Sequence, residues 1–159
     1  PDSARAARLR ELAAALSIDA PAGRLDAVEQ ALHDDVEVWQ ATAAGRRLGK
    51  RELLAGMRAL GKALRGYRYT DIERVFHADG YVQTHVLRGT ARDGTEVAAP
   101  AALWVDVRDG SVIAVREYLD SAAVAPLFRA PPPTFCPSRP SGPPIPGAIS
   151  WSSPIRSAP

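Results

Sequence analysis

The sequence predicts an α+β fold in which three helices come before most of a largely antiparallel sheet. The first observation is periodicity, because apolar residues repeat every three or four positions in segments before Gly66 and every second position after it. The second is a set of three Asp-Gly pairs, at 79–80, 93–94 and 109–110. Asp-Gly between alternating segments is a strong hairpin signal. Helices followed by hairpin-linked strands are typical of α+β domains.

The three predicted helices cover residues 3–17, about 24–33 and about 50–65. Each has an apolar stripe at helical spacing; the stripe residues are Leu9, Leu12, Ala13 and Leu16, then Leu25, Val28, Ala31 and Leu32, then Leu53, Leu54, Met57, Leu60 and Leu64. Pro21 and Gly23 separate the first two helices, because proline and glycine interrupt helical backbone. Gly66 is the expected C-cap of the third helix.

One strand is predicted between the helices and four after them. Their expected ranges are Val36–Thr42, Tyr67–His77, Tyr81–Arg92, Glu96–Val107 and Ser111–Asp120. A turn-rich connection, Ala43–Gly49, precedes the third helix, and a short closing helix is expected over Ser121–Phe128. Asp120 or Ser121 would be the N-cap of that closing helix. Helices packed on one face of a strongly curved sheet would leave a cavity between the two layers.

Residues 1–129 are predicted to form one domain, and residues 130–159 a proline-rich tail that is irregular or disordered. Proline-rich sequence cannot sustain a helix or a central strand. The chain has 20 basic and 18 acidic residues. The two extra bases, Arg139 and Arg156, lie in the tail, which contains no acid. The domain is therefore formally neutral, which argues against a nucleic-acid partner.

Composition excludes several further classes. A single cysteine, Cys136, excludes an intramolecular disulfide and a cysteine-based zinc site. The three histidines (His33, His77 and His85) lack metal-ligand spacing, so we expect no metal. No apolar stretch is long enough to span a membrane, and the Arg/Ala-rich N-terminus does not resemble a secretory signal. We therefore expect a cytoplasmic protein without a membrane partner.

Four motifs, taken in order, resemble the SnoaL-like branch of the NTF2-like superfamily. They are Leu32–Trp39, Gly49–Leu54, Arg88-Gly89-Thr90 with Asp93-Gly94, and Asp109-Gly110 with Arg116–Asp120. The resemblance covers about residues 5–128 and leaves the tail uncovered. It implies a cone-shaped, cystatin-like fold, in which a curved sheet packed on three helices encloses a pocket. It also implies a homodimer. Family activities include polyketide cyclases, ketosteroid isomerases and limonene-type epoxide hydrolases.

Glu117 is the leading candidate for a catalytic residue. Side chains alternate along a strand, so Glu117 shares a face with Ile113, Val115 and Leu119. An isolated carboxyl group on an apolar face has its pKa raised, which suits general acid/base chemistry. The resemblance also places an acidic residue here in cyclases and epoxide hydrolases. The alternative is that Glu117 faces solvent or pairs with an arginine.

Two further positions are candidates, although the parity of their strands is left open. Gln40 lies near the amide with which epoxide hydrolases of the family hold water, whereas Trp39 would line the pocket instead. His85 could pair with Glu117 and relay a proton; its alternative is a structural hydrogen bond. The segment Thr84–Val86 stands where those hydrolases carry an Arg-x-Asp pair, which argues against epoxide hydrolysis. The first predicted helix also lacks the tyrosine of the isomerases.

We therefore expect a cofactor-free cyclase or isomerase, of lyase or isomerase type, that acts on a small hydrophobic molecule with a carbonyl group. The expected catalytic residues are Glu117, His85 and Gln40, and the expected substrate-binding residues are Trp39, Val38, Thr84, Val86, Leu103, Val115 and Leu119. The alternative is a non-catalytic module of the same fold that binds a small ligand or serves as a dimerisation domain.

Overall fold

The computed structural model describes residues 2–16, 25–41 and 45–128. Its elements are α1 (Asp2–Leu16), α2 (Leu25–Ala31), β1 (Leu32–Gln40), β2 (Arg46–Leu48), α3 (Lys50–Ala63), β3 (Leu64–His77), β4 (Gly80–Ala91), β5 (Glu96–Arg108), β6 (Ser111–Leu119) and the 3-10 helix η1 (Ala125–Phe128). The predicted break at Pro21 and Gly23, the strand end at Thr42 and the proline-rich tail with Cys136 lie outside the described residues.

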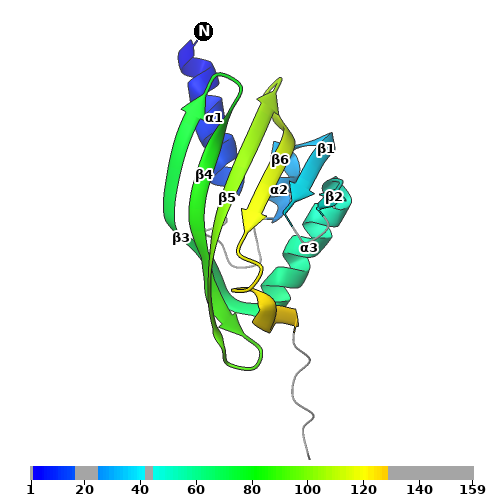
Figure 1. Cartoon of the computed structure of the whole chain (residues 1–159). Coiled ribbons are helices and arrows are strands. Elements are labelled where there is room, and N and C mark those ends of the chain that lie inside the picture. The colour runs from blue at the N-terminus through cyan, green and yellow to red at the C-terminus, as the bar shows by residue number, and fades with distance from the viewer. Residues whose placement is uncertain (1, 17–24, 42–44, 129–159) are drawn as a thin grey trace, which may run out of the picture.

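The strands form one curved six-stranded sheet in the order β2-β1-β6-β5-β4-β3. Only the β1–β6 pair is parallel within the described sheet, and the other pairs are antiparallel. The three Asp-Gly pairs lie at the connections between β3, β4, β5 and β6, as predicted. Figure 1 shows the helices α1, α2 and α3 gathered on one side of the sheet. The predicted α+β fold is therefore confirmed.

The core lies between the helices and one face of the sheet, called here the inner face. Val38, Val115, Val105 and Tyr81 are paired across four strands and are buried together. Helical residues that include Leu12 and Val28 belong to the same cluster. Burial of one large apolar side chain contributes about 1.5–3 kcal/mol. This cluster therefore fixes which face of each strand points inward.

Two boundaries differ from the sequence prediction around the first strand. The second helix stops at Ala31, and β1 begins at Leu32 rather than at Val36. Leu32 is paired with Val112 of β6, and the two side chains are 3% and 0% exposed. Burial in the sheet therefore outweighs the helical spacing of Leu32. The connection predicted over Ala43–Gly49 also contains the short strand β2, which the sequence analysis missed.

Gly66 is not a helix C-cap, so that prediction is wrong. The cap of α3 is Leu64, whose backbone is extended (φ −124°, ψ 104°) and whose side chain is buried in the sheet. Gly66 lies within β3 at a shift in register between Arg65 and Arg68, with φ +58°. Glycine adopts that left-handed conformation without steric cost. The residue therefore serves a strand irregularity rather than the end of a helix.

The predicted closing helix is only partly helical. Residues 121–124 form turns, and the 3-10 helix η1 follows. Pro126 lacks the backbone N–H that a continuous α-helix needs. Asp120 Oδ1 accepts hydrogen bonds from the backbone N–H groups of Ala122 and Ala123, at 2.9 and 3.3 Å. Asp120 therefore stabilises the turn over residues 121–124, whereas η1 begins only at Ala125, so Asp120 is not adjacent to the helix that it was expected to cap.

Candidate active site

A row of polar side chains crosses the inner face of the sheet. On adjacent strands, each residue of the row is paired with the next, in the order Gln40, Glu117, Leu103, Gln83 and Arg74. Leu103 is the one apolar member. Residues paired across a sheet point to the same face. This row lies two residues along the strands from the buried row of Val38, Val115, Val105 and Tyr81. The pairing therefore brings four polar groups from four strands into a largely apolar interior.

Glu117 and Gln40 form a direct hydrogen bond. The side-chain nitrogen Nε2 of Gln40 donates to Oε2 of Glu117 at 2.5 Å, and both residues are partly buried. The parallel pairing of β1 with β6 brings these residues together. Burial raises the pKa of the Glu117 carboxyl group, although the hydrogen bond from Gln40 lowers it in part. A carboxyl group with a raised pKa can exchange protons at a pH closer to neutrality.

His85 faces a different partner from the one considered in the sequence analysis. Its side chain is 4% exposed, and its Nδ1 lies 3.2 Å from Nε2 of Gln83. Arg74 Nε donates to Oε1 of Gln83 at 2.8 Å. Burial and the nearby Arg74 charge lower the pKa of His85 to about 4. The imidazole is therefore neutral near pH 7.

Tyr69 connects the side chains of His85 and Glu117. The centroid of its ring lies 4.0 Å from that of His85. Burial, and then the charge of Glu117, raise the pKa of the Tyr69 hydroxyl, so it stays protonated near neutral pH. Because Tyr69 contacts His85 and interacts electrostatically with Glu117, the three side chains form one local cluster.

Tyr69, Gln83 and Arg74 were not among the predicted site residues. Gln83 had a sequence signal, because it lies two positions from His85 and must share its face in a regular strand. Tyr69 and Arg74 had none, because β3 has two shifts in register, between Arg65 and Arg68 and between Thr70 and Glu73. Simple alternation cannot be followed across such bulges.

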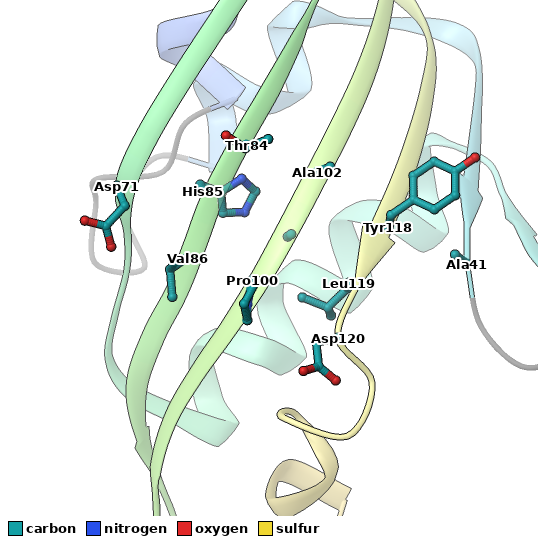
Figure 2. Close-up of a pocket in the computed structure, with 11 residues that line it drawn as sticks. Ala41, Asp71, Thr84, His85, Val86, Pro100, Ala102, Tyr118, Leu119 and Asp120 are labelled. Carbon is teal, nitrogen blue, oxygen red and sulfur yellow. The ribbon is translucent and has the colours of Figure 1, made fainter.

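A hollow of about 550 Å³ lies over neighbouring parts of β4, β5 and β6. Figure 2 shows the ring of His85 extending from β4 toward β5 in this region. The predicted site residues His85, Thr84, Val86 and Leu119 line the hollow. Glu117 and Gln40 do not line it, although Leu119 and Ala41, close to them in the chain, do.

The ten predicted site residues divide between the two faces of the sheet. Those on the inner face are Glu117, His85, Gln40, Val38, Leu103, Val115 and Leu119. The other three (Trp39, Thr84 and Val86) are on the opposite face, called here the outer face. Trp39 makes an edge contact with Tyr118, with centroids 5.3 Å apart. The structure therefore does not bring Trp39, Thr84 or Val86 to Glu117. Of the two neighbouring candidates on the first strand, Gln40 faces the interior and Trp39 does not.

Within the described ranges, no group of three or more His, Cys, Asp and Glu side chains is placed to hold a metal ion. No helix in the part of the chain that the structure describes is long and apolar enough to cross a membrane.

The sequence of residues 9–115 matches the model of the SnoaL-like domain family. This chain belongs to that family. The match includes Gln40 and His85 and stops two residues before Glu117. A search of curated proteins finds no match for this SnoaL-like chain.

Solved structures share the fold. A protein from Jannaschia sp. CCS1, proposed to be a SnoaL-like polyketide cyclase, is 20% identical, with a TM-score of 0.65 over 79% of this chain and 94% of that one. A proposed polyketide cyclase from Xanthomonas campestris is 21% identical, with a TM-score of 0.61 over 72% and 91%. A proposed isomerase from Bacillus subtilis is 14% identical, with a TM-score of 0.66 over 78% and 94%. At these identities the likeness shows the fold alone.

Proposed function

We propose that this SnoaL-like protein is a cofactor-free cyclase or isomerase that acts on a small, hydrophobic molecule with a carbonyl group. The hydrogen-bonded pair of Glu117 and Gln40 on the inner face carries the proposal. The raised pKa of Glu117 supports a role in proton transfer. Val38, Val115 and Leu119 supply apolar surface beside the carboxyl group. The cyclase and isomerase proposals made for structural neighbours agree with this chemistry.

The ionised Glu117 would remove a proton from the carbon next to the carbonyl group, leaving an enolate and a protonated Glu117. In an isomerase, that proton returns to a different carbon of the same molecule. In a cyclase, the enolate carbon attacks a second carbonyl carbon of the same molecule, and the new alkoxide takes the proton from Glu117. Both routes restore the carboxylate and need no oxidant or reductant. Gln40 would hold the carboxyl group in position throughout.

The test is α-proton exchange in deuterium oxide, followed by NMR with decalone as a hydrophobic ketone. Elimination of a nitrobenzisoxazole, which requires only a base in an apolar site, provides a second probe. We expect both rates to rise with pH through the raised pKa of Glu117, because the carboxylate is the active form. Rates no higher than those with the same concentration of free acetate would overturn the proposal.

Non-catalytic ligand binding is the second candidate function. The observation that favours it is the hollow beside His85, which Glu117 does not line. In the same experiments, this function predicts that decalone binds, as seen by shifts in the protein NMR spectrum, while its protons do not exchange. That result would replace the enzymatic proposal with a binding role.

We further propose that the outer face of the sheet binds a second copy of this chain. An apolar row crosses it from Val75 through Val82 and Trp104, and continues past Arg116 to Trp39. Trp104 and Tyr118 are 48% and 52% exposed, and exposed aromatic side chains are enriched at protein interfaces.

The charges of this face favour a copy of the same surface as its partner. Arg116 is paired with Asp106 and Arg88 with Asp71, each with 3.4 Å between nitrogen and oxygen. These ion pairs leave an apolar centre with balanced charge around it, which suits neither a nucleic acid nor a strongly charged protein. A two-fold axis brings such a face onto itself, as in an isologous dimer.

Replacing Trp104 with serine is expected to convert a dimer into a monomer, because it removes the largest exposed apolar side chain of the outer face. Sedimentation equilibrium of the full chain would measure the change. Phe76→Ser is the matched control, since Phe76 is also exposed (39%) but is paired with Tyr81 and therefore belongs to the inner face. A monomeric wild-type protein, or a Trp104→Ser variant that remains dimeric, would contradict this interface.

A further inference from the structure

Two side chains of the inner face each keep one polar atom without a hydrogen bond. Oε2 of Glu117 accepts from Gln40, and no described residue bonds to the second carboxyl oxygen, Oε1. The hydroxyl of Tyr69 likewise has no hydrogen-bond partner among the residues that the structure describes. A carboxylate oxygen can only accept, whereas a protonated phenol can donate. The inner face therefore offers one base and one donor that the fold itself does not use.

Neither of these two atoms is sealed inside the core. Over residues 2–16, 25–41 and 45–128, the Tyr81 hydroxyl is the one buried side-chain nitrogen or oxygen that lacks a hydrogen bond. Oε1 of Glu117 and the Tyr69 hydroxyl also lack one but are not buried, so each borders space that a ligand can enter. Both residues are partly buried, whereas Gln83 and His85 are 1% and 4% exposed.

Strand pairing places Tyr69 on the same face as Glu117. Tyr69 is paired with Leu87 of β4, which is 4% exposed and belongs to the core. The Tyr69 ring lies against His85, with the centroids 4.0 Å apart, and against Tyr67, with the centroids 6.2 Å apart. Aromatic pairs have preferred relative orientations. These two contacts therefore restrict the Tyr69 ring and give its hydroxyl a defined direction.

We infer that Tyr69 is a further catalytic residue, whose hydroxyl donates a hydrogen bond to the carbonyl oxygen of the substrate while Oε1 of Glu117 removes the neighbouring proton. This inference rests on the proposed function. The carbon–hydrogen bond breaks, its electron pair forms the double bond of the enolate, and the proton binds to Oε1. The π electrons of the carbonyl group move to its oxygen, which Tyr69 stabilises without giving up its own proton. Return of the proton from Oε1 to carbon restores both side chains.

The electrostatics of the two groups suit this division of roles. Burial, and then the charge of Glu117, raise the pKa of the Tyr69 hydroxyl, so it remains a donor throughout the neutral pH range. The effect of Glu117 on Tyr69 also means that the two groups lie within electrostatic range of each other. Because the Glu117 carboxylate would repel a second negative charge, the substrate class is a neutral ketone or aldehyde with a C–H bond next to the carbonyl group.

The decisive variant is Tyr69→Phe, which removes only the hydroxyl and keeps the ring against His85. In the full-length protein, we expect kcat for decalone exchange to fall by about 10²–10³-fold, the usual cost of losing one oxyanion donor. Elimination of the nitrobenzisoxazole should fall much less, because its nitro group delocalises the charge that develops on oxygen. Tyr81→Phe is the matched control, since it makes the same atomic change at a hydroxyl sealed in the core, and both rates should stay unchanged.

Wild-type exchange by Tyr69→Phe would overturn the inference. An equal loss of both reactions would also overturn it, because that result would indicate a structural role for Tyr69.

A second measurement does not depend on turnover. It is the carbon-13 shift of the carbonyl group of labelled decalone bound to Glu117→Gln. We expect a downfield shift that disappears when Tyr69→Phe is added, and its persistence would overturn the inference. A shift that depends on Tyr69 in a protein that exchanges no ketone would count against the proposed function and leave the donor standing. Exchange that does not depend on Tyr69 would remove the donor and leave the proposed function standing.

Discussion

Replacing Glu117 with glutamine is expected to lower the rate of ketone α-proton exchange by about 10²–10⁴-fold, the usual contribution of one general base. The same change is expected to stabilise the fold at about pH 8. Burial raises the pKa of Glu117, so the folded state favours the protonated carboxyl group. That contribution is fully present below the unfolded-state pKa and is lost as pH rises through the raised one. A neutral amide of nearly the same shape removes this cost.

The variant is expected to lose exchange activity and to gain stability, and these opposite changes distinguish the prediction from a simple loss of structure. Exchange would be followed by NMR, and the free energy of unfolding would be measured by urea titration at about pH 8. Glu37→Gln is the matched control, because Glu37 lies on β1, is exposed and forms a 3.5 Å ion pair with Arg47. We expect Glu37→Gln to leave both quantities nearly unchanged. A Glu117→Gln variant that keeps wild-type exchange would show that another group is the base.

The features of the sheet that the sequence predicted are those governed by local rules. Asp-Gly turns define hairpins, and strict alternation places Val115, Glu117 and Leu119 on one face. The structure confirms that placement, because Glu117 is paired with Gln40 and Leu103 on the inner face. Alternation fails at the start of the same strand. A shift in register between Asp106 and Val107 buries Val112, whereas Ile113 was predicted to share the face of Glu117.

The remaining parts of the site depend on contacts between distant residues. The sequence left two interpretations of His85 open, a pair with Glu117 or a structural hydrogen bond. Register places Gln83 between Arg74 and Leu103, and Gln83 bonds to His85. Tyr69 reaches the cluster from a strand whose alternation is interrupted near Asp71, where φ is +54°. No local pattern reports such a bulge, so Tyr69 and Arg74 could be assigned only from the structure.

Acidification is expected to destabilise the fold through His85, by about 3 kcal/mol between pH 6.5 and pH 4. The pKa of His85 falls from 6.5 to about 4 on folding, chiefly because the ring is buried. Between those values the unfolded chain binds a proton that the folded chain does not, so stability falls as pH falls. A difference of this size in pKa corresponds to about 3 kcal/mol. Its full effect should be reached near the lower of the two pKa values.

Glu117 has to be removed from this measurement because its raised pKa acts in the opposite direction: protonation of its carboxyl group favours the folded state as the pH falls. Urea unfolding from pH 7 to pH 4 is therefore best compared between Glu117→Gln and the double variant Glu117→Gln with His85→Phe, which keeps an aromatic ring against Tyr69. The double variant should show a pH dependence smaller by about 3 kcal/mol. An equal pH dependence of the free energy of unfolding with and without His85 would contradict this prediction. It would mean that the imidazole takes up a proton as readily in the folded chain as in the unfolded one, despite its burial beside Arg74.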